Sequence, residues 1–112
     1  MRANAQLEIS IRRRPELKAL HKYVYLRVRS QSASLSEHSL VWMIDADRAL
    51  SSLNQVDIDV MVGRVLGYSL PEIAVKLHMN QQRAERCIAR GSKRMAKAFV
   101  DWQVIPAAEV LR

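Results

Sequence analysis

Apolar residues recur at intervals of three and four along much of the chain, the spacing that places side chains on one face of a helix. The first such stripe lies over residues 15–29, where Pro15 suits the opening turn of a helix. The segment YVYLRV, residues 23–28, is also rich in β-branched and aromatic residues, so a short strand is the alternative there. The stripe consists of Leu17, Leu20, Val24 and Val28.

The serine-rich stretch SQSASLS, residues 30–36, interrupts this pattern. We expect it to separate an N-terminal basic arm and helix, residues 1–33, from a helical domain over residues 34–112. Ser34 and Glu37 have the spacing of a capping box, which predicts that a second helix begins there and ends near residues 51–54. Its apolar face would consist of Leu40, Val41, Ile44, Ala46, Leu50 and Leu53.

Two further helix starts follow in close succession. Asn54 is suited to cap a helix over residues 55–66, and Gly67 is suited to end it because glycine readily adopts the left-handed conformation. Ser69 and Glu72 then form a second capping box, so a new helix begins almost at once. We therefore expect an all-α protein.

The short helix from Ser69 is predicted to run to about Leu77, and residues 78–80 to turn tightly into a long basic helix capped by Asn80. Such a pair of helices is typical of a helix-turn-helix, here over residues 55–98. The positions expected to face the core are Ala84, Cys87, Ile88, Gly91 and Met95.

The opposite face of that long helix carries side chains suited to DNA. Glutamine can form two hydrogen bonds with adenine, and arginine can do the same with guanine, so both suit base edges in a major groove. Glu85 has the wrong sign for a polyanion unless it accepts from a cytosine amino group. The predicted DNA-binding residues are Gln81, Gln82, Arg83, Glu85, Arg86, Arg90, Lys93 and Arg94.

The segment GYSLPEIAVKLHMNQQRAERCIARGSKRM, residues 67–95, resembles region 4 of the sigma-70 factors. In that family a Gly-x-Ser-x-x-Glu-Ile-Ala-x-x-Leu helix precedes a recognition helix with a basic tail. The upstream IDADRALSSL, residues 44–53, is similar to the lead-in helix of small phage and gene-transfer-agent transcription regulators. The resemblance covers roughly residues 44–99. The matching positions are Gly67, Ser69, Glu72, Ile73, Ala74, Leu77 and Asn80.

In sigma factors this module binds the upstream promoter element and docks on the flap of the polymerase β subunit. A complete sigma factor also has a region 2 that melts DNA, and we expect residues 1–43 to be too short for one. The resemblance therefore implies an accessory activator or antiterminator that contacts DNA and bacterial RNA polymerase, with or without a companion regulator. The alternative is a protein-interaction module that mimics region 4 and binds polymerase without reading DNA. The implied base-facing residues are Gln81, Gln82, Glu85 and Arg86.

The formal net charge of +7 is unevenly distributed. Residues 1–29 have eight bases and two acids (+6), residues 30–62 one base and five acids (−4), and residues 63–112 nine bases and four acids (+5). Clustered bases favour a polyanion partner, and a solvated basic surface is the alternative. The same two alternatives apply to an arm formed by Arg12, Arg13 and Arg14.

The acidic middle of the chain is expected to face away from DNA, toward a protein partner. Trp42 and Trp102 are the expected anchors, either for that partner or in the core. Further apolar residues expected to add to the partner surface are Val41, Ile44, Phe99, Val104 and Ile105.

Residues suited to catalysis or metal binding are sparse. Cys87 is the only cysteine, and its spacing from the three histidines does not suit a metal site. There is no nucleophile-base grouping and no glycine-rich phosphate loop, so we expect neither an enzyme nor a cofactor. The apolar runs are short and no signal-peptide pattern is visible, so we expect a cytoplasmic protein without a membrane segment.

Overall fold

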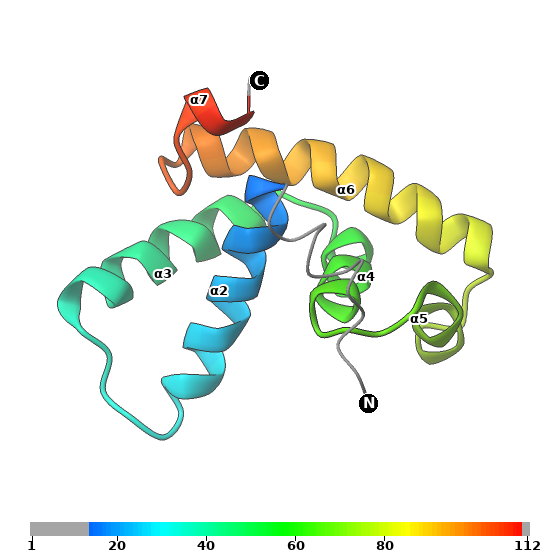
Figure 1. Cartoon of the computed structure of the whole chain (residues 1–112), viewed down its shortest axis with the longest axis horizontal. Helices are drawn as coiled ribbons and strands as arrows, with labels where there is room; N and C mark the ends of the chain where they lie inside the picture. The colour runs from blue at the N-terminus through cyan, green and yellow to red at the C-terminus, as the bar shows by residue number, and fades with distance from the viewer. Residues whose placement is uncertain (1–13, 111–112) are drawn as a thin grey trace.

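The computed structural model describes residues 14–110, and this part of the chain contains six helices (Figure 1). No strand occurs within that part, which confirms the all-α fold, and the segment YVYLRV is helical. None of these helices is both long and apolar enough to cross a lipid bilayer. The helices are α2 (Pro15–Arg29), α3 (Glu37–Ser51), α4 (Gln55–Val65), α5 (Leu70–Lys76), α6 (Gln81–Asp101) and α7 (Ala107–Val110).

Helix starts are set by side chains that satisfy the free backbone N–H groups of the first turn. The predicted caps Asn54 and Asn80 are confirmed, because each side chain accepts a hydrogen bond from the turn that follows. The capping box is also confirmed: Ser69 Oγ accepts from the N–H of Glu72, and Glu72 Oε1 accepts from the N–H of Ser69. Gly67 has a φ of 97°, as expected for the glycine that ends α4.

The start of α3 differs from the prediction. Ser36, not Ser34, is the cap, and its Oγ accepts from the N–H of Ser39 at 3.1 Å. Glu37 then becomes the first helical residue, where its negative charge still favours the positive end of the helix dipole. The capping-box spacing is present in the sequence, but the nearer serine takes the position.

The main core lies where α2 and α3 meet α6. Leu20 of α2 and Phe99 of α6 are completely buried in it, together with Met61 of α4. Ser92 of α6 donates a hydrogen bond of 2.5 Å to Glu16 of α2 inside this contact, so the buried carboxylate has a partner. The helix before the serine-rich stretch therefore belongs to one core with the helices after it.

The apolar face predicted for α3 is correct only in its second half. Ala46 and Leu50 are buried, whereas Leu40, Val41 and Ile44 are 44, 53 and 43% exposed. The reason is tertiary: α3 packs against α2 and α6, and its first half extends beyond α6 (Figure 1). Leu40, Val41 and Ile44 therefore have no other helix of residues 14–110 packed over them and stay exposed.

The chain reverses direction after α6. Gln103 has a φ of 58°, and the N–H of Val104 then donates to the carbonyl of Phe99 at 2.7 Å. Val104 and Ile105 are each only 8% exposed, because the reversal folds them against the end of α6. The expectation that Phe99, Val104 and Ile105 add to a partner surface was therefore wrong. Trp102 stays outside and is 43% exposed.

Helices α4 and α6 cross at Gly91, where the missing side chain lets them approach closely. A Cβ at Gly91 would lie 2.8 Å from Met61 Sδ and 3.1 Å from Asp57 Cβ, both on α4. Gly91 was predicted to face the core, and it is buried at this crossing. A second, smaller core lies beside the crossing and joins α4, α5 and α6 through Val60, Ile73, Ala84 and Cys87.

We predict that Gly91→Ala lowers the free energy of unfolding by about 1–3 kcal/mol, because the added methyl group overpacks the crossing. At an unrestricted helix position the same change would stabilise the protein by up to about 1 kcal/mol. The two effects have opposite sign, so denaturant unfolding separates them. Ala89→Gly, at an exposed position of the same helix, is the control and should cost only the helix-propensity difference.

Candidate nucleic-acid interface

The turn between α5 and α6 is fixed by its own backbone. His78 adopts a φ of 55°, a left-handed conformation in which histidine is one of the more frequent non-glycine residues. The N–H of Met79 donates to the carbonyl of Ala74 at 2.9 Å, and Asn80 then caps α6. Together with the small core formed by α4, α5 and α6, this turn holds the first half of α6 in one orientation.

The first turns of α6 present a set of polar side chains to solvent, which we call the outer face of α6. All of its members are exposed, and within residues 14–110 their side chains form neither ion pairs nor side-chain hydrogen bonds. Their donors and acceptors therefore face solvent and are not used by any other side chain of residues 14–110. The outer face consists of Gln81, Gln82, Arg83, Glu85 and Arg86.

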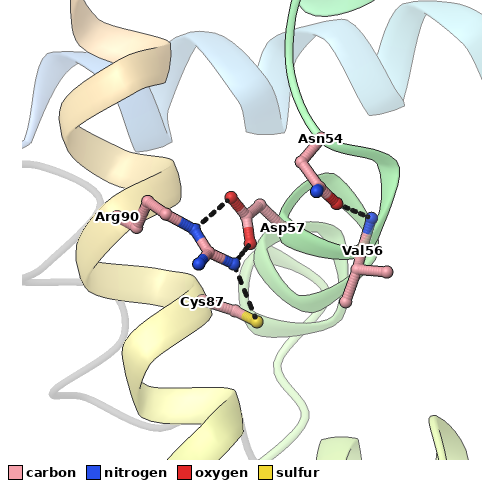
Figure 2. Close-up of polar contacts among 5 residues, drawn as sticks. All are labelled: Asn54, Val56, Asp57, Cys87 and Arg90. Atoms are coloured by element: carbon pink, nitrogen blue, oxygen red, sulfur yellow. Dashed lines mark hydrogen bonds and ion pairs between the residues drawn. The ribbon is translucent and has the colours of Figure 1, made fainter.

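Arg90 lies at the edge of the outer face and differs from its neighbours. Its Nε donates to Asp57 Oδ2 at 2.9 Å, and its Nη2 donates to Asp57 Oδ1 at 2.7 Å (Figure 2). The Cys87 sulfur lies 3.9 Å from the same Nη2. Arg90 was predicted to bind DNA together with these neighbours. In the structure it is also the α6 half of an ion pair that joins α6 to α4.

The carboxylate of this pair is almost completely enclosed. Asp57 is only 2% exposed, whereas the Arg90 side chain is 47% exposed. Hydrogen bonds from Arg90 are the largest reason why the pKa of Asp57 lies below its usual range. Cys87 is buried as predicted, and burial is the largest reason why the pKa of its thiol is raised. Cys87 is therefore neutral at neutral pH and packs as a small apolar side chain.

The ion pair changes the interpretation of the acidic middle of the chain. Asp57 was counted among the acids expected to face a protein partner, but its charge is neutralised inside the fold. Sequence reasoning placed both residues of the pair correctly on their helices and still missed the contact, since they lie 33 positions apart. Only the crossing at Gly91 brings them together.

The second half of α6 continues the basic surface. Lys93 and Arg94, both predicted to bind DNA, are exposed, and Lys93 lies two turns after Arg86 on the same side of the helix. Lys97 is also exposed, but its Nζ lies 2.7 Å from Asp101 one turn further on. The exposed bases therefore extend well beyond the first turns of α6.

The remaining predicted residues lie apart from the outer face. Arg14 is exposed at the start of α2, and Arg12 and Arg13 fall outside the described residues. Trp42 is half-buried: its Nε1 donates to the carbonyl of Val104 at 3.3 Å, and Lys22 Nζ lies 4.2 Å from the ring centroid. Trp42 is thus an internal anchor between α3 and the chain reversal.

Trp102 has open surface, with the Arg48 guanidinium 6.0 Å from its ring centroid.

Among residues 14–110 no group of three histidine, cysteine or acidic residues is arranged to hold a metal ion. Comparisons with protein-family models, curated proteins and solved structures gave no match.

We predict that the Asp57–Arg90 pair makes the protein sensitive to acid. The folded state lowers the pKa of Asp57, so the pair stabilises the fold fully above the usual value of about 3.8 and loses this contribution as the pH falls below it. Asp57→Asn should lower the free energy of unfolding at neutral pH. It should also make this free energy fall less steeply below about pH 4. Thermal unfolding across pH checks this, and an Asp57→Asn variant with the acid decline of the parent would contradict it.

Proposed function

We propose that the chain is a DNA-binding transcription regulator that acts in the bacterial cytoplasm together with RNA polymerase, as an accessory activator or antiterminator. The observation that supports this most directly is the free outer face of α6, held in a fixed orientation by a short helix and a tight turn. A helix of this kind, presented by a preceding short helix, is the element that enters a major groove in helix-turn-helix proteins.

The residues of the outer face suit direct contact with bases. Gln82 and Arg86 are one helical turn apart on the same side of α6, and their side chains have no hydrogen-bond partner among residues 14–110. Glutamine matches the paired acceptor and donor of adenine, and arginine matches the two acceptors of guanine. Glu85 would select cytosine, whose amino group is a donor, and would disfavour positions without one.

The charges around the outer face suit the DNA backbone. Arg83, Lys93 and Arg94 are exposed and carry no ion pair within residues 14–110, so their charges are available to phosphates. A single helical module of this size makes few phosphate contacts, and its intrinsic affinity should therefore be modest. A partner that is itself held at the promoter would supply the missing binding energy.

The surface of α3 supports a protein partner. Leu40, Val41 and Ile44 are exposed on its first half, and Trp102 is exposed near Arg48 on its second half. Exposed apolar area of this kind is typical of protein interfaces. The region 4-like module then contributes DNA contacts while α3 and Trp102 contribute contacts with polymerase.

We predict that Gln82→Ala and Arg86→Ala each lose about 1–3 kcal/mol of discrimination at one or two base pairs, with unfolding unchanged because both side chains are free. The measurement is selection of bound duplexes from a random pool, followed by competition titrations with single base-pair changes. Gln31→Ala, an exposed glutamine between α2 and α3, is the matched control. If both variants select the parental sequence with undiminished preference, α6 does not read bases.

We predict that Trp102→Ala weakens the complex of protein, DNA and polymerase by about tenfold, because an aromatic anchor is lost, and weakens binding to bare DNA by less than twofold. The test compares mobility shifts with and without purified polymerase core enzyme. Val75→Ala is the control, because it shortens an apolar side chain on α5 that is more exposed than Trp102. A nanomolar, sequence-specific footprint from the bare protein, with no gain from polymerase, would favour a self-sufficient regulator instead.

A further inference from the structure

The guanidinium of Arg90 has one edge engaged and one edge open. Nε and Nη2 point to the two oxygens of Asp57, and Nη1 has no hydrogen-bond partner within residues 14–110 (Figure 2). The side chain is 47% exposed while Asp57 is 2% exposed. The ion pair is thus asymmetric, with a buried carboxylate behind the guanidinium and solvent in front of it.

The Asp57 side of the ion pair is held in place by two further contacts. Asp57 lies in the first turn of α4, which the Asn54 side chain caps through the N–H of Val56 at 2.9 Å (Figure 2). The Cβ of Asp57 also lies against Gly91, the residue that follows Arg90 on α6. A guanidinium paired at two points with a fixed carboxylate has lost most of its rotational freedom before any ligand arrives.

The position of Arg90 along α6 indicates which ligand its open edge meets. Arg86, Arg90 and Arg94 follow one another at intervals of four residues, so each is about 6 Å further along the helix axis. Arg86 belongs to the outer face near the start of α6, and Arg90 is one turn beyond it. An arginine behind the base-contacting turns of a groove-bound helix meets the sugar-phosphate backbone rather than base edges.

We propose that Asp57 is a positioning residue for DNA binding: it holds Arg90 so that the free Nη1 edge binds a backbone phosphate and fixes how α6 lies in the groove. This inference rests on the proposed function. The carboxylate adds a negative charge near a polyanion, yet it strengthens binding because it presents an ordered donor in place of a mobile one. Positioning and simple charge attraction therefore predict opposite effects for the loss of this acid.

The experiment compares Asp57→Asn with Asp59→Asn on the full chain, using a duplex selected by the parent protein. Both changes remove one negative charge from α4, but Asp59 is exposed, and within residues 14–110 its side chain bonds only to Gln55. Charge attraction alone makes both variants bind more tightly, with a steeper dependence on salt. Positioning predicts that Asp59→Asn binds as tightly as the parent or more tightly, while Asp57→Asn binds about 3- to 10-fold more weakly. It also predicts that the salt slope of Asp57→Asn falls by up to about 0.9, the value of one phosphate contact.

Arg90→Lys provides a second test if Asp57→Asn is too unstable to assay. Lysine retains the charge opposite Asp57 but lacks the planar fork that bonds a carboxylate on one edge and a phosphate on the other. We expect the same 3- to 10-fold loss, with a circular-dichroism spectrum and melting curve that show a folded protein.

Three results are decisive. Tighter binding by Asp57→Asn, matching Asp59→Asn, would overturn the positioning role and leave DNA binding intact. Full affinity in folded Arg90→Lys would overturn it as well. A parent protein that selects no duplex and gives no salt-dependent shift would overturn the proposed function itself, and the positioning role with it.

Discussion

The crossing of α4 and α6 at Gly91 determines where the other helices lie. Because Gly91 has no side chain, Met61 and Asp57 of α4 approach the backbone of α6 directly. The two hydrophobic cores form on either side of this point, one shared with α5 and the other with α2 and α3. The same closeness buries the carboxylate of Asp57, which requires a cation within hydrogen-bonding distance, and Arg90 is the adjacent residue that supplies it.

Features determined by neighbouring residues could be predicted from the sequence. Asn54, Ser69 and Asn80 act as caps because a short polar side chain satisfies an N–H only two or three residues away. Gly67 ends α4 because its own backbone adopts the left-handed conformation. The spacing of apolar residues along α6 also predicted which of its side chains are buried and which are exposed, because this spacing depends only on residues within the helix. Most of the candidate site is therefore visible in the sequence.

Features that depend on contacts between distant segments could not be predicted in this way. The partner of Arg90 is set by the helix crossing, so no spacing along α6 distinguishes Arg90 from Arg86. Periodicity assigned Leu40 and Ile44 to a buried face, but it contains no information on how far α6 extends over α3. The burial of Val104 similarly depends on a single backbone reversal at Gln103. In each case the residue type was suited to two environments, and the tertiary arrangement selected one.

The length of α6 has a mechanical consequence. The helix is continuous for 21 residues, or about 30 Å, and contains no proline. Its first turns carry the outer face, and Trp102 directly follows its last turn. The candidate DNA-contacting and partner-contacting residues therefore lie at the two ends of one continuous helix. A rotation imposed at the Trp102 end therefore turns Gln81 with it, because the helix is continuous and packs against α3, α4 and α5. Molecules bound at the two ends must therefore accept the same orientation of α6, and each one that fixes this orientation makes the other's contacts easier or harder to form by an equal amount.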